Sequence, residues 1–178
     1  DEKIAWHDYK SKWISNKSSR EYAHKLRSMS QAILTTSKTV IKDDPRLTIR
    51  LKKTLEQHIP IIIIDNNLKI PMKSKILNDI SKKRIIIFTS KKNKKSQNLI
   101  KLGCEIIFCK LNKNKKLNLK NIFSKIYSLK ISDLLVEAGG IFFTELLNNN
   151  LVDEIHLFKS KIIIGKHGKP AIVGKKLN

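Results

Sequence analysis

Residues 33–50, ILTTSKTVIKDDPRLTIR, pass from an apolar run through small hydroxyl residues to a paired acid and then to alternating residues. Together with Ala32, the apolar start is typical of a buried strand. A strand that opens into a polar loop with two acids and a terminal arginine often presents reactive groups at the edge of a sheet. The alternative is a plain turn at Asp43-Asp44-Pro45 between two strands, and the residues alone favour neither reading.

Apolar strands and amphipathic helices alternate along the rest of the chain. Ser18 and Glu21 match a capping box for the first helix. The alternation predicts an α/β fold in one domain spanning residues 1–178, with a mostly parallel central sheet flanked by helices. Residues 153–164 are typical of a long strand or a strand pair. The other predicted strands are 61–65, 84–89, 104–109 and 133–137, and the predicted helices are 19–30, 96–102, 119–129 and 141–147.

The composition is that of a globular protein with a strong lysine bias. The 178 residues are 40% hydrophobic and carry a formal net charge of +22. Because the lysines are scattered and aromatic residues make up only 6% of the chain, a specific nucleic-acid interface is not favoured. The apolar runs are much shorter than the roughly 20 residues of a membrane helix. Cys104 and Cys109 fall on opposite faces of one predicted strand, so we expect no disulfide between them and a cytoplasmic protein.

Arginine is rare and unevenly placed. Only five arginines occur, and four of them lie in the first fifty residues. In a chain that uses lysine for solvated charge, a guanidinium suggests bidentate binding of a phosphate or a carboxylate. Arg20, His24 and Arg27 share one face of the first predicted helix. The alternative for these arginines is a plain surface charge, and His24 is predicted to be a helix-face residue rather than a catalytic base.

A second candidate site follows the predicted strand 133–137, where Gly139 and Gly140 lead into a helix. Backbone N–H groups at a helix N-terminus bind anions, and glycine lets a phosphate come close to the backbone. Glu137 is expected to point into the same crevice, although a plain β-α turn explains the glycines equally well. The five histidines and two cysteines have no metal-ligand spacing, so no metal site is predicted.

Several motifs, in this order, resemble the reductase domain of the bifunctional riboflavin-biosynthesis deaminase–reductase. Each motif alone is common, whereas their combination is specific and covers most of the chain. The motifs are SKWIS at 11–15, Arg20 with HKLR at 24–27, AILT at 32–35, TV at 39–40, DDP at 43–45, LT at 47–48 with Arg50, IID at 63–65, VEAG at 136–139 and LVDE at 151–154.

The resemblance implies a dihydrofolate-reductase-like α/β fold, NADPH as the cofactor and a homodimer. The implied reaction reduces the ribosyl group of a phosphorylated pyrimidine, 5-amino-6-(5-phosphoribosylamino)uracil, to a ribityl chain. Asp43 or Glu137 is expected to assist the proton transfer, and the residues do not say which. The implied substrate contacts are Ser11, Arg27, Leu47, Arg50 and Glu137, with the two arginines on the phosphate. The implied NADPH contacts are Trp13, Thr39, Asp43, Asn66, Gly139, Gly140, Ile141, Phe142, Phe143, Thr144 and Glu145.

Two features depart from the family pattern. No zinc deaminase domain is found in these residues, so deamination is not expected and a separate deaminase protein is a candidate partner. The first strand and the last strands of the family are also expected to be missing. Three alternatives stay open: a weakened or non-catalytic subunit of a separate deaminase, a reductase of the same fold with another pterin or pyrimidine substrate, and a basic nucleic-acid-binding protein. NADPH binding would separate the riboflavin-biosynthesis reductase and the same-fold reductase from the non-catalytic subunit and the nucleic-acid-binding protein.

Overall fold

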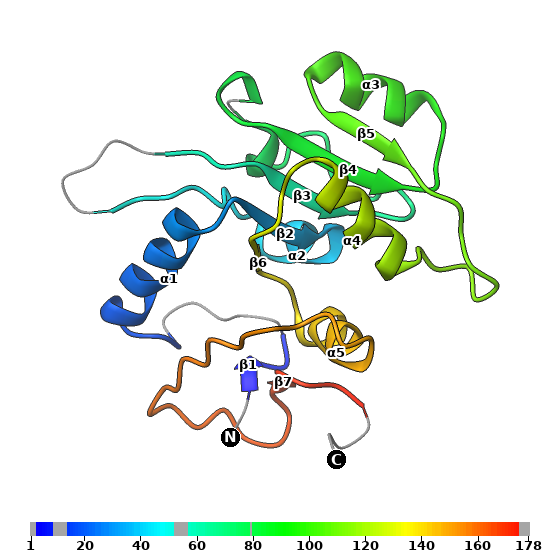
Figure 1. Cartoon of the computed structure of the whole chain (residues 1–178). Helices are drawn as coiled ribbons and strands as arrows, with labels where there is room; N and C mark the ends of the chain where they lie inside the picture. Colours follow the sequence, from blue (N-terminus) through cyan, green and yellow to red (C-terminus); the bar gives the residue numbers. More distant parts are fainter. Residues whose placement is uncertain (1–2, 9–13, 52–56, 79, 175–178) are drawn as a thin grey trace. The chain divides into compact units, whose positions relative to one another are not determined.

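A computed structural model describes residues 3–8, 14–51, 57–78 and 80–174 (Figure 1). The chain divides into two compact units. The larger unit comprises residues 24–137, and the smaller unit comprises residues 1–23 together with residues 138–178. Each unit has a sheet of its own.

The larger unit is built on a five-stranded parallel sheet. The strand order is β5-β4-β3-β2-β6, and every neighbouring pair is parallel. The chain therefore moves outward from β2 in one direction as far as β5 and then returns to the other side of β2 with β6. This arrangement confirms the predicted α/β class and its parallel sheet. The strands are β2 (Ala32–Thr36), β3 (Ile61–Ile64), β4 (Ile85–Thr89), β5 (Glu105–Phe108) and β6 (Leu134–Val136).

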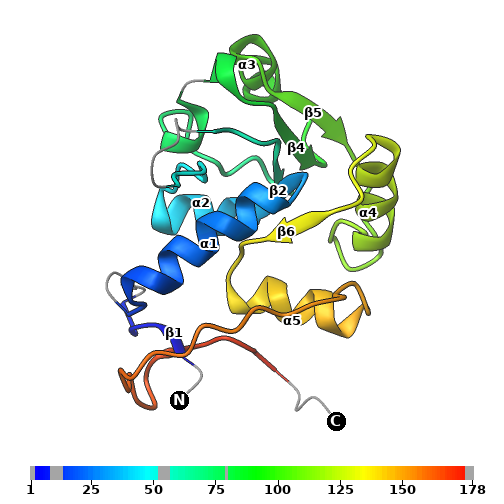
Figure 2. The same cartoon turned by 60° about the vertical axis from the view of Figure 1, so that its left-hand side comes forward.

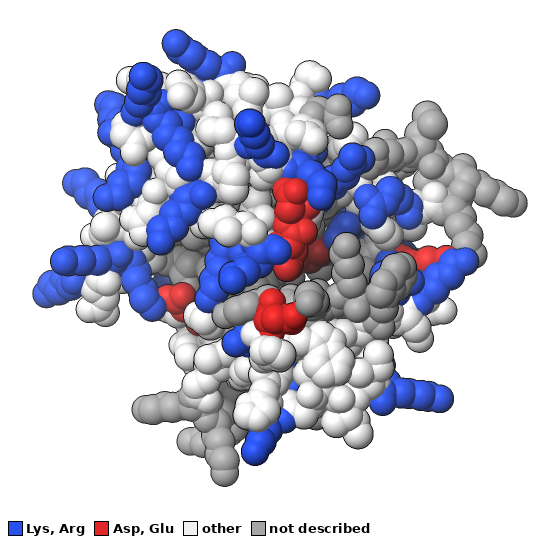
Figure 3. Space-filling view, turned by 180° about the vertical axis from the view of Figure 1, so that it is seen from behind, with Lys and Arg blue, Asp and Glu red and all other residues white. Residues whose placement is uncertain are grey.

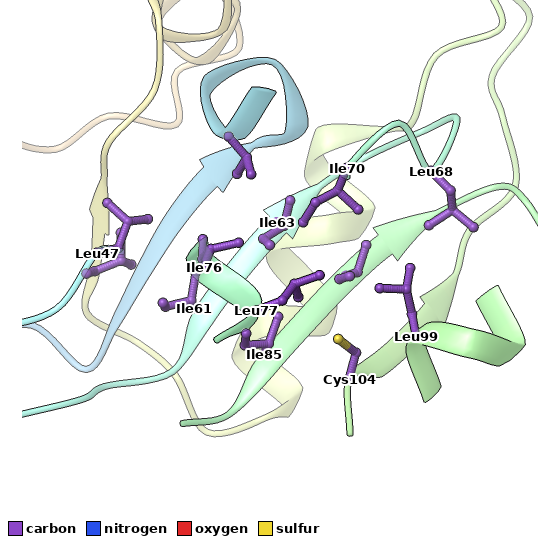
Figure 4. Packing of buried hydrophobic residues seen from close by; sticks show 13 residues of the cluster. Leu47, Ile61, Ile63, Leu68, Ile70, Ile76, Leu77, Ile85, Leu99 and Cys104 are labelled. Atoms are coloured by element: carbon purple, nitrogen blue, oxygen red, sulfur yellow. The ribbon is translucent and has the colours of Figure 1, made fainter. Parts of the chain in front are cut away.

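The helices cover both faces of this sheet, which explains the unbroken isoleucine runs in its central strands. One face packs against a cluster that includes Val40, Ile76 and Leu99 from the segments between the strands (Figure 4). On the other side of the strands lies α4, whose Ile122 and Ile126 are buried (Figures 2 and 4). Successive strand residues point to opposite faces, so both faces must be apolar.

Most predicted helices are confirmed to within a few residues. The start of α1 differs from the prediction. The Ser19 N–H donates to Asn16 Oδ1 at 2.8 Å, so Asn16 caps the helix. The predicted capping box at Ser18 and Glu21 is therefore wrong. Gly103 ends α3 in a left-handed conformation with φ 109°. The helices are α1 (Lys17–Met29), α2 (Ser37–Asp43), α3 (Lys94–Leu102), α4 (Leu119–Ser128) and α5 (Gly140–Asn148), with short 3-10 turns η1 (Lys75–Leu77) and η2 (Ile80–Lys82).

The segment after β2 differs from the predicted polar loop. Thr36 is the N-cap of α2, and its hydroxyl accepts from the Thr39 N–H at 3.3 Å. Hydroxyl residues suit a helix N-cap as well as a loop, which is why their pattern misled the prediction. The alternating residues that follow form no sheet strand either. Among the described residues of this segment, Ile49 alone makes a bridge, to Gln57.

The smaller unit contains α5 and a two-stranded antiparallel sheet of β1 (Lys3–Ala5) and β7 (Lys169–Pro170). The predicted strand at 153–164 is wrong, because these residues form no regular element. Their alternating apolar residues have no neighbouring strand to pair with among the described residues, and a strand needs such a partner for its N–H and C=O groups. Phe158 instead packs against Tyr22, with ring centroids 5.9 Å apart.

The distribution of charged side chains and the state of the cysteines match what the sequence indicated. On the face drawn in Figure 3, Lys and Arg side chains are scattered among uncharged ones. Cys104 and Cys109 are both free thiols, as expected. No described helix is long and apolar enough to cross a membrane.

Candidate active site

The centre of the candidate site is an ion pair between α1 and the end of β6. Arg27 Nε donates to Glu137 Oε1 at 2.5 Å, and Nη2 donates to Oε2 at 2.7 Å. The two side chains are 14% and 28% exposed. The Glu137 N–H donates to the Leu34 carbonyl at 2.9 Å, which extends the pairing of β6 with β2 and fixes the residue at the carboxyl edge of the sheet. A bidentate pair of this kind holds both side chains in one orientation.

The same arginine also holds the segment that follows Asp43-Asp44-Pro45. Arg27 Nη1 donates to the Thr48 carbonyl at 2.8 Å. Arg50 Nη1 donates to Thr48 Oγ1 at 2.7 Å, and the Arg50 N–H donates to His24 Nδ1 at 3.2 Å. Three residues that the sequence predicted as substrate contacts, Arg27, Arg50 and Glu137, therefore meet in one cluster through Thr48.

His24 lies inside this cluster, although the sequence indicated only a helix-face residue. Burial of the ring lowers the pKa of His24, and the positive charges of Arg27 and Arg50 lower it further. The Thr48 carbonyl and the Glu137 carboxylate act in the opposite direction. The net effect favours the neutral imidazole, which keeps one ring nitrogen as an acceptor.

The loop with the paired acid contains two left-handed residues. Asp44 has φ 41° and Leu47 has φ 51°. Such a conformation is costly for a branched side chain, and strain of this kind is found most often at functional sites. Leu47 is buried in the core cluster (Figure 4), and Asp44 accepts from the Lys75 N–H at 2.8 Å. Asp43 lies at the surface at the end of α2, where partial burial of its carboxyl group raises its pKa and Lys42 partly opposes this.

Two of the predicted cofactor contacts lie at the carboxyl ends of neighbouring strands in the larger unit. Thr39 follows β2, and its hydroxyl lies 3.2 Å from that of Thr36. Asn66 follows β3, and its Oδ1 accepts from the Ser90 hydroxyl at 2.8 Å. Asn66 Nδ2 donates to the Lys115 carbonyl at 3.3 Å. Ligands of open parallel sheets bind beyond this edge, so both residues stand on the expected side.

In the smaller unit, the two glycines at the start of α5 have different surroundings. A Cβ on Gly140 would lie 2.5 Å from the carbonyl oxygens of both Pro170 and Ala171, so close backbone packing requires this glycine. A Cβ on Gly139 would meet nothing within 4 Å. Gly139 is the N-cap of α5, and none of the described side chains caps the helix there. Gly139 is therefore the glycine beside which there is open space at the helix N-terminus.

The other α5 residues in the predicted cofactor set are not alike. The Thr144 hydroxyl donates to the Gly140 carbonyl and accepts from the Val173 N–H, both at 2.8 Å, so it serves the packing of the unit. Ile141 is exposed, whereas Phe142, Phe143 and Glu145 are partly buried.

Comparison with known proteins identifies the family. The family model described as the RibD C-terminal domain matches residues 1–178. The chain belongs to the RibD C-terminal domain family. Within this family, the riboflavin biosynthesis protein RibD of Aquifex aeolicus is 39% identical over 166 residues, which cover 93% of this chain and 45% of that protein. The chain thus spans less than half the length of this relative.

A second relative is closer in length. The 5-amino-6-(5-phosphoribosylamino)uracil reductase of Buchnera aphidicola is 29% identical over 171 residues, which cover 90% of this chain and 80% of that protein. Solved structures of the RibD family show the same fold. RibD of Acinetobacter baumannii has a TM-score of 0.78 at 20% identity and covers 100% of this chain and 48% of its own. The predicted dihydrofolate-reductase-like α/β fold is confirmed.

Two predicted site residues of this RibD-family chain, Ser11 and Trp13, lie outside the described residues. Among the residues that are described, no group of three or more His, Cys, Asp or Glu side chains could hold a metal ion. The sequence missed the bonds that join the cluster through Thr48 and His24. The shared helical face of His24 and Arg27 was the only available signal for them.

Proposed function

We propose that this chain is an NADPH-dependent reductase of riboflavin biosynthesis that reduces the ribosyl group of 5-amino-6-(5-phosphoribosylamino)uracil to a ribityl chain. The observation that carries the proposal is that Arg27, Arg50 and Glu137, the substrate contacts that the resemblance implies, are joined in one cluster through Thr48. Membership of the family and the named reductase of Buchnera aphidicola support the reaction.

The two arginines of the cluster have different roles in substrate binding. Among the described residues, the only side-chain hydrogen bond of Arg50 is the one to Thr48 Oγ1, so other N–H donors of its exposed guanidinium can take a phosphate. Arg27 donates to Glu137 and Thr48 with all three of its nitrogens. We therefore assign the phosphate to Arg50. Arg27 holds Glu137 in position, where its carboxylate oxygens retain lone pairs for N–H or O–H groups of the substrate.

Each unit, taken by itself, contains residues that the resemblance assigns to NADPH. The uncapped N-terminus of α5, with open space beside Gly139, fits a phosphate group. The Thr39 hydroxyl and the Asn66 amide offer hydrogen bonds at the carboxyl ends of β2 and β3. When bound, NADPH supplies a hydride, and the protein contributes binding and orientation.

The proton transfer is assigned to Asp43. Both oxygens of Glu137 already accept from Arg27, whereas the Asp43 carboxyl group has a raised pKa, which favours proton exchange closer to neutral pH.

The test is the oxidation of NADPH, followed by its near-ultraviolet absorbance, with the deaminated phosphoribosylaminopyrimidine as substrate. Arg50→Ala is expected to raise KM by about 10- to 100-fold, the loss of a hydrogen bond to a charged group. Arg84→Ala is the matched control, because Arg84 pairs with Glu105 on the surface. It should leave KM unchanged.

Two outcomes would contradict the proposal. NADPH binding without turnover would indicate a reductase of the same fold that acts on another substrate. Neither binding nor turnover in a folded protein would overturn the assignment of a reductase.

A further inference from the structure

His24 makes a contact that its place on the helix face does not require. Its Nδ1 accepts from the backbone N–H of Arg50 at 3.2 Å, across 26 residues of sequence. An imidazole nitrogen accepts a hydrogen bond only when it carries no proton. The contact therefore exists in the neutral state of the ring and not in the imidazolium.

Segment 48–50 is held to α1 by two side chains three residues apart. His24 accepts the Arg50 N–H, and Arg27 donates to the Thr48 carbonyl at 2.8 Å. Residues at this spacing lie on the same helix face, so both bonds reach the segment from one side. The Arg50 guanidinium is then oriented by a third bond, to Thr48 Oγ1 at 2.7 Å.

We propose that His24 is a positioning residue, whose unprotonated Nδ1 fixes the backbone of Arg50 and thereby the direction of the guanidinium that takes the substrate phosphate. This role concerns the site of the proposed function and rests on it for its catalytic consequence. The structural part, a bond between His24 and Arg50, stands independently of any turnover.

The proposal predicts that the hydrogen bond from the Arg50 N–H to His24 is lost at low pH. On protonation, Nδ1 would carry a hydrogen that faces the Arg50 N–H, and two donors cannot bond each other. The charges around the ring are Arg27 on the same helix, Arg50 on the facing segment and Glu137 after β6. The two cations oppose the imidazolium, whereas the Thr48 carbonyl and the Glu137 carboxylate favour it. Because burial and the cations together lower the pKa of His24, the bond is complete at neutral pH and is lost as pH falls through that lowered value.

The direct test is nuclear magnetic resonance of the whole chain labelled with nitrogen-15, titrated from about pH 8 to about pH 5. We expect the Arg50 amide to shift with the same midpoint as the His24 ring. Its protection factor, which compares the measured exchange rate with the intrinsic rate at the same pH, should fall by roughly a factor of five to ten below that midpoint, as for the loss of one net hydrogen bond.

Two variants separate positioning from packing. His24→Asn places Oδ1 near the position of Nδ1, so it should keep the Arg50 amide protected at every pH of the titration. His24→Leu fills the space without an acceptor and should expose the amide at every pH. In turnover, KM of the wild type should rise as pH falls, whereas KM of His24→Asn should not follow that midpoint.

The outcomes are distinguishable from those of the proposed function. An Arg50 amide that ignores the His24 titration, or that is equally protected in His24→Leu, would overturn the positioning role. The wild type and both variants could lack turnover while the wild-type Arg50 amide still follows the His24 titration. In that case the bond between His24 and Arg50 is supported and the proposed reaction is refuted.

Discussion

The pair of Arg27 and Glu137 gives the sharpest prediction, and Glu137→Gln is the change that tests it. The amide keeps the size of the side chain but removes the charge and replaces one acceptor oxygen with a donor that faces Arg27. The pair is neither fully buried nor fully exposed, with side chains 14% and 28% accessible. Exposed pairs contribute less than about 1 kcal/mol, and breaking a buried pair costs about 3–5 kcal/mol. We therefore expect a loss of about 2 kcal/mol of unfolding free energy, or roughly 4–8 °C in Tm for a chain of this size.

The assay is urea unfolding of the wild type, Glu137→Gln, Arg27→Met and the double variant. The four proteins form a double-mutant cycle, and the expected coupling energy is about 2 kcal/mol. The chain supplies its own control in Arg84 and Glu105, which are paired through the same atoms at 2.6 and 2.9 Å but are 39% and 47% exposed. Glu105→Gln should cost less than about 1 kcal/mol.

Two results would refute this reasoning. A coupling energy near zero between Arg27 and Glu137 would mean that the pair does not order the site. An equal loss in Glu105→Gln and Glu137→Gln would mean that burial does not decide the strength of these pairs.

The remaining predictions concern the two glycines and Asp43. Gly140→Ala should destabilise the protein by about 1–3 kcal/mol, because its Cβ would lie 2.5 Å from two carbonyl oxygens. Gly139→Ala should destabilise the protein by only about 0.5–1 kcal/mol, because alanine is a poorer N-cap than glycine, and it should weaken NADPH binding, which isothermal titration measures. Asp43→Asn should lower kcat by on the order of 100-fold. The same variant should raise Tm slightly at neutral pH, because partial burial raises the pKa of Asp43 and so penalises its charged form. This difference in Tm should vanish as pH falls through the raised pKa, where the wild-type carboxyl group also becomes neutral.

The central strands were predictable because burial on both faces leaves a plain signature. Ile61–Ile64 and Ile85–Thr89 are continuous apolar runs, and each became a parallel strand. The strand predicted at 153–164 was wrong for a related reason. Alternation indicates a strand only if a neighbour completes its hydrogen bonds, and a sequence does not state which neighbours exist.

The candidate site was predicted residue by residue but not as a set of contacts. Arg27 and Glu137 were both chosen for the substrate, yet nothing in the sequence joined them, because they are 110 positions apart. Their pairing follows from the return of the chain beside β2, which brings the end of β6 to α1. His24 was discounted for a similar reason, since its acceptor role depends on a backbone N–H that no side-chain motif records.

The most direct measurement of the central claim is the fate of the hydride. NADPH labelled with deuterium at C4 of the nicotinamide would be incubated with 5-amino-6-(5-phosphoribosylamino)uracil and the whole chain, and the product would be examined by mass spectrometry. The proposed reductase predicts a ribitylamino product that has gained one hydride and one proton, with a deuterium on the sugar carbon, and its formation should fall in Arg50→Ala. Unchanged substrate in the presence of folded protein and bound NADPH, or a reduced product without deuterium from either face of the nicotinamide, would contradict it.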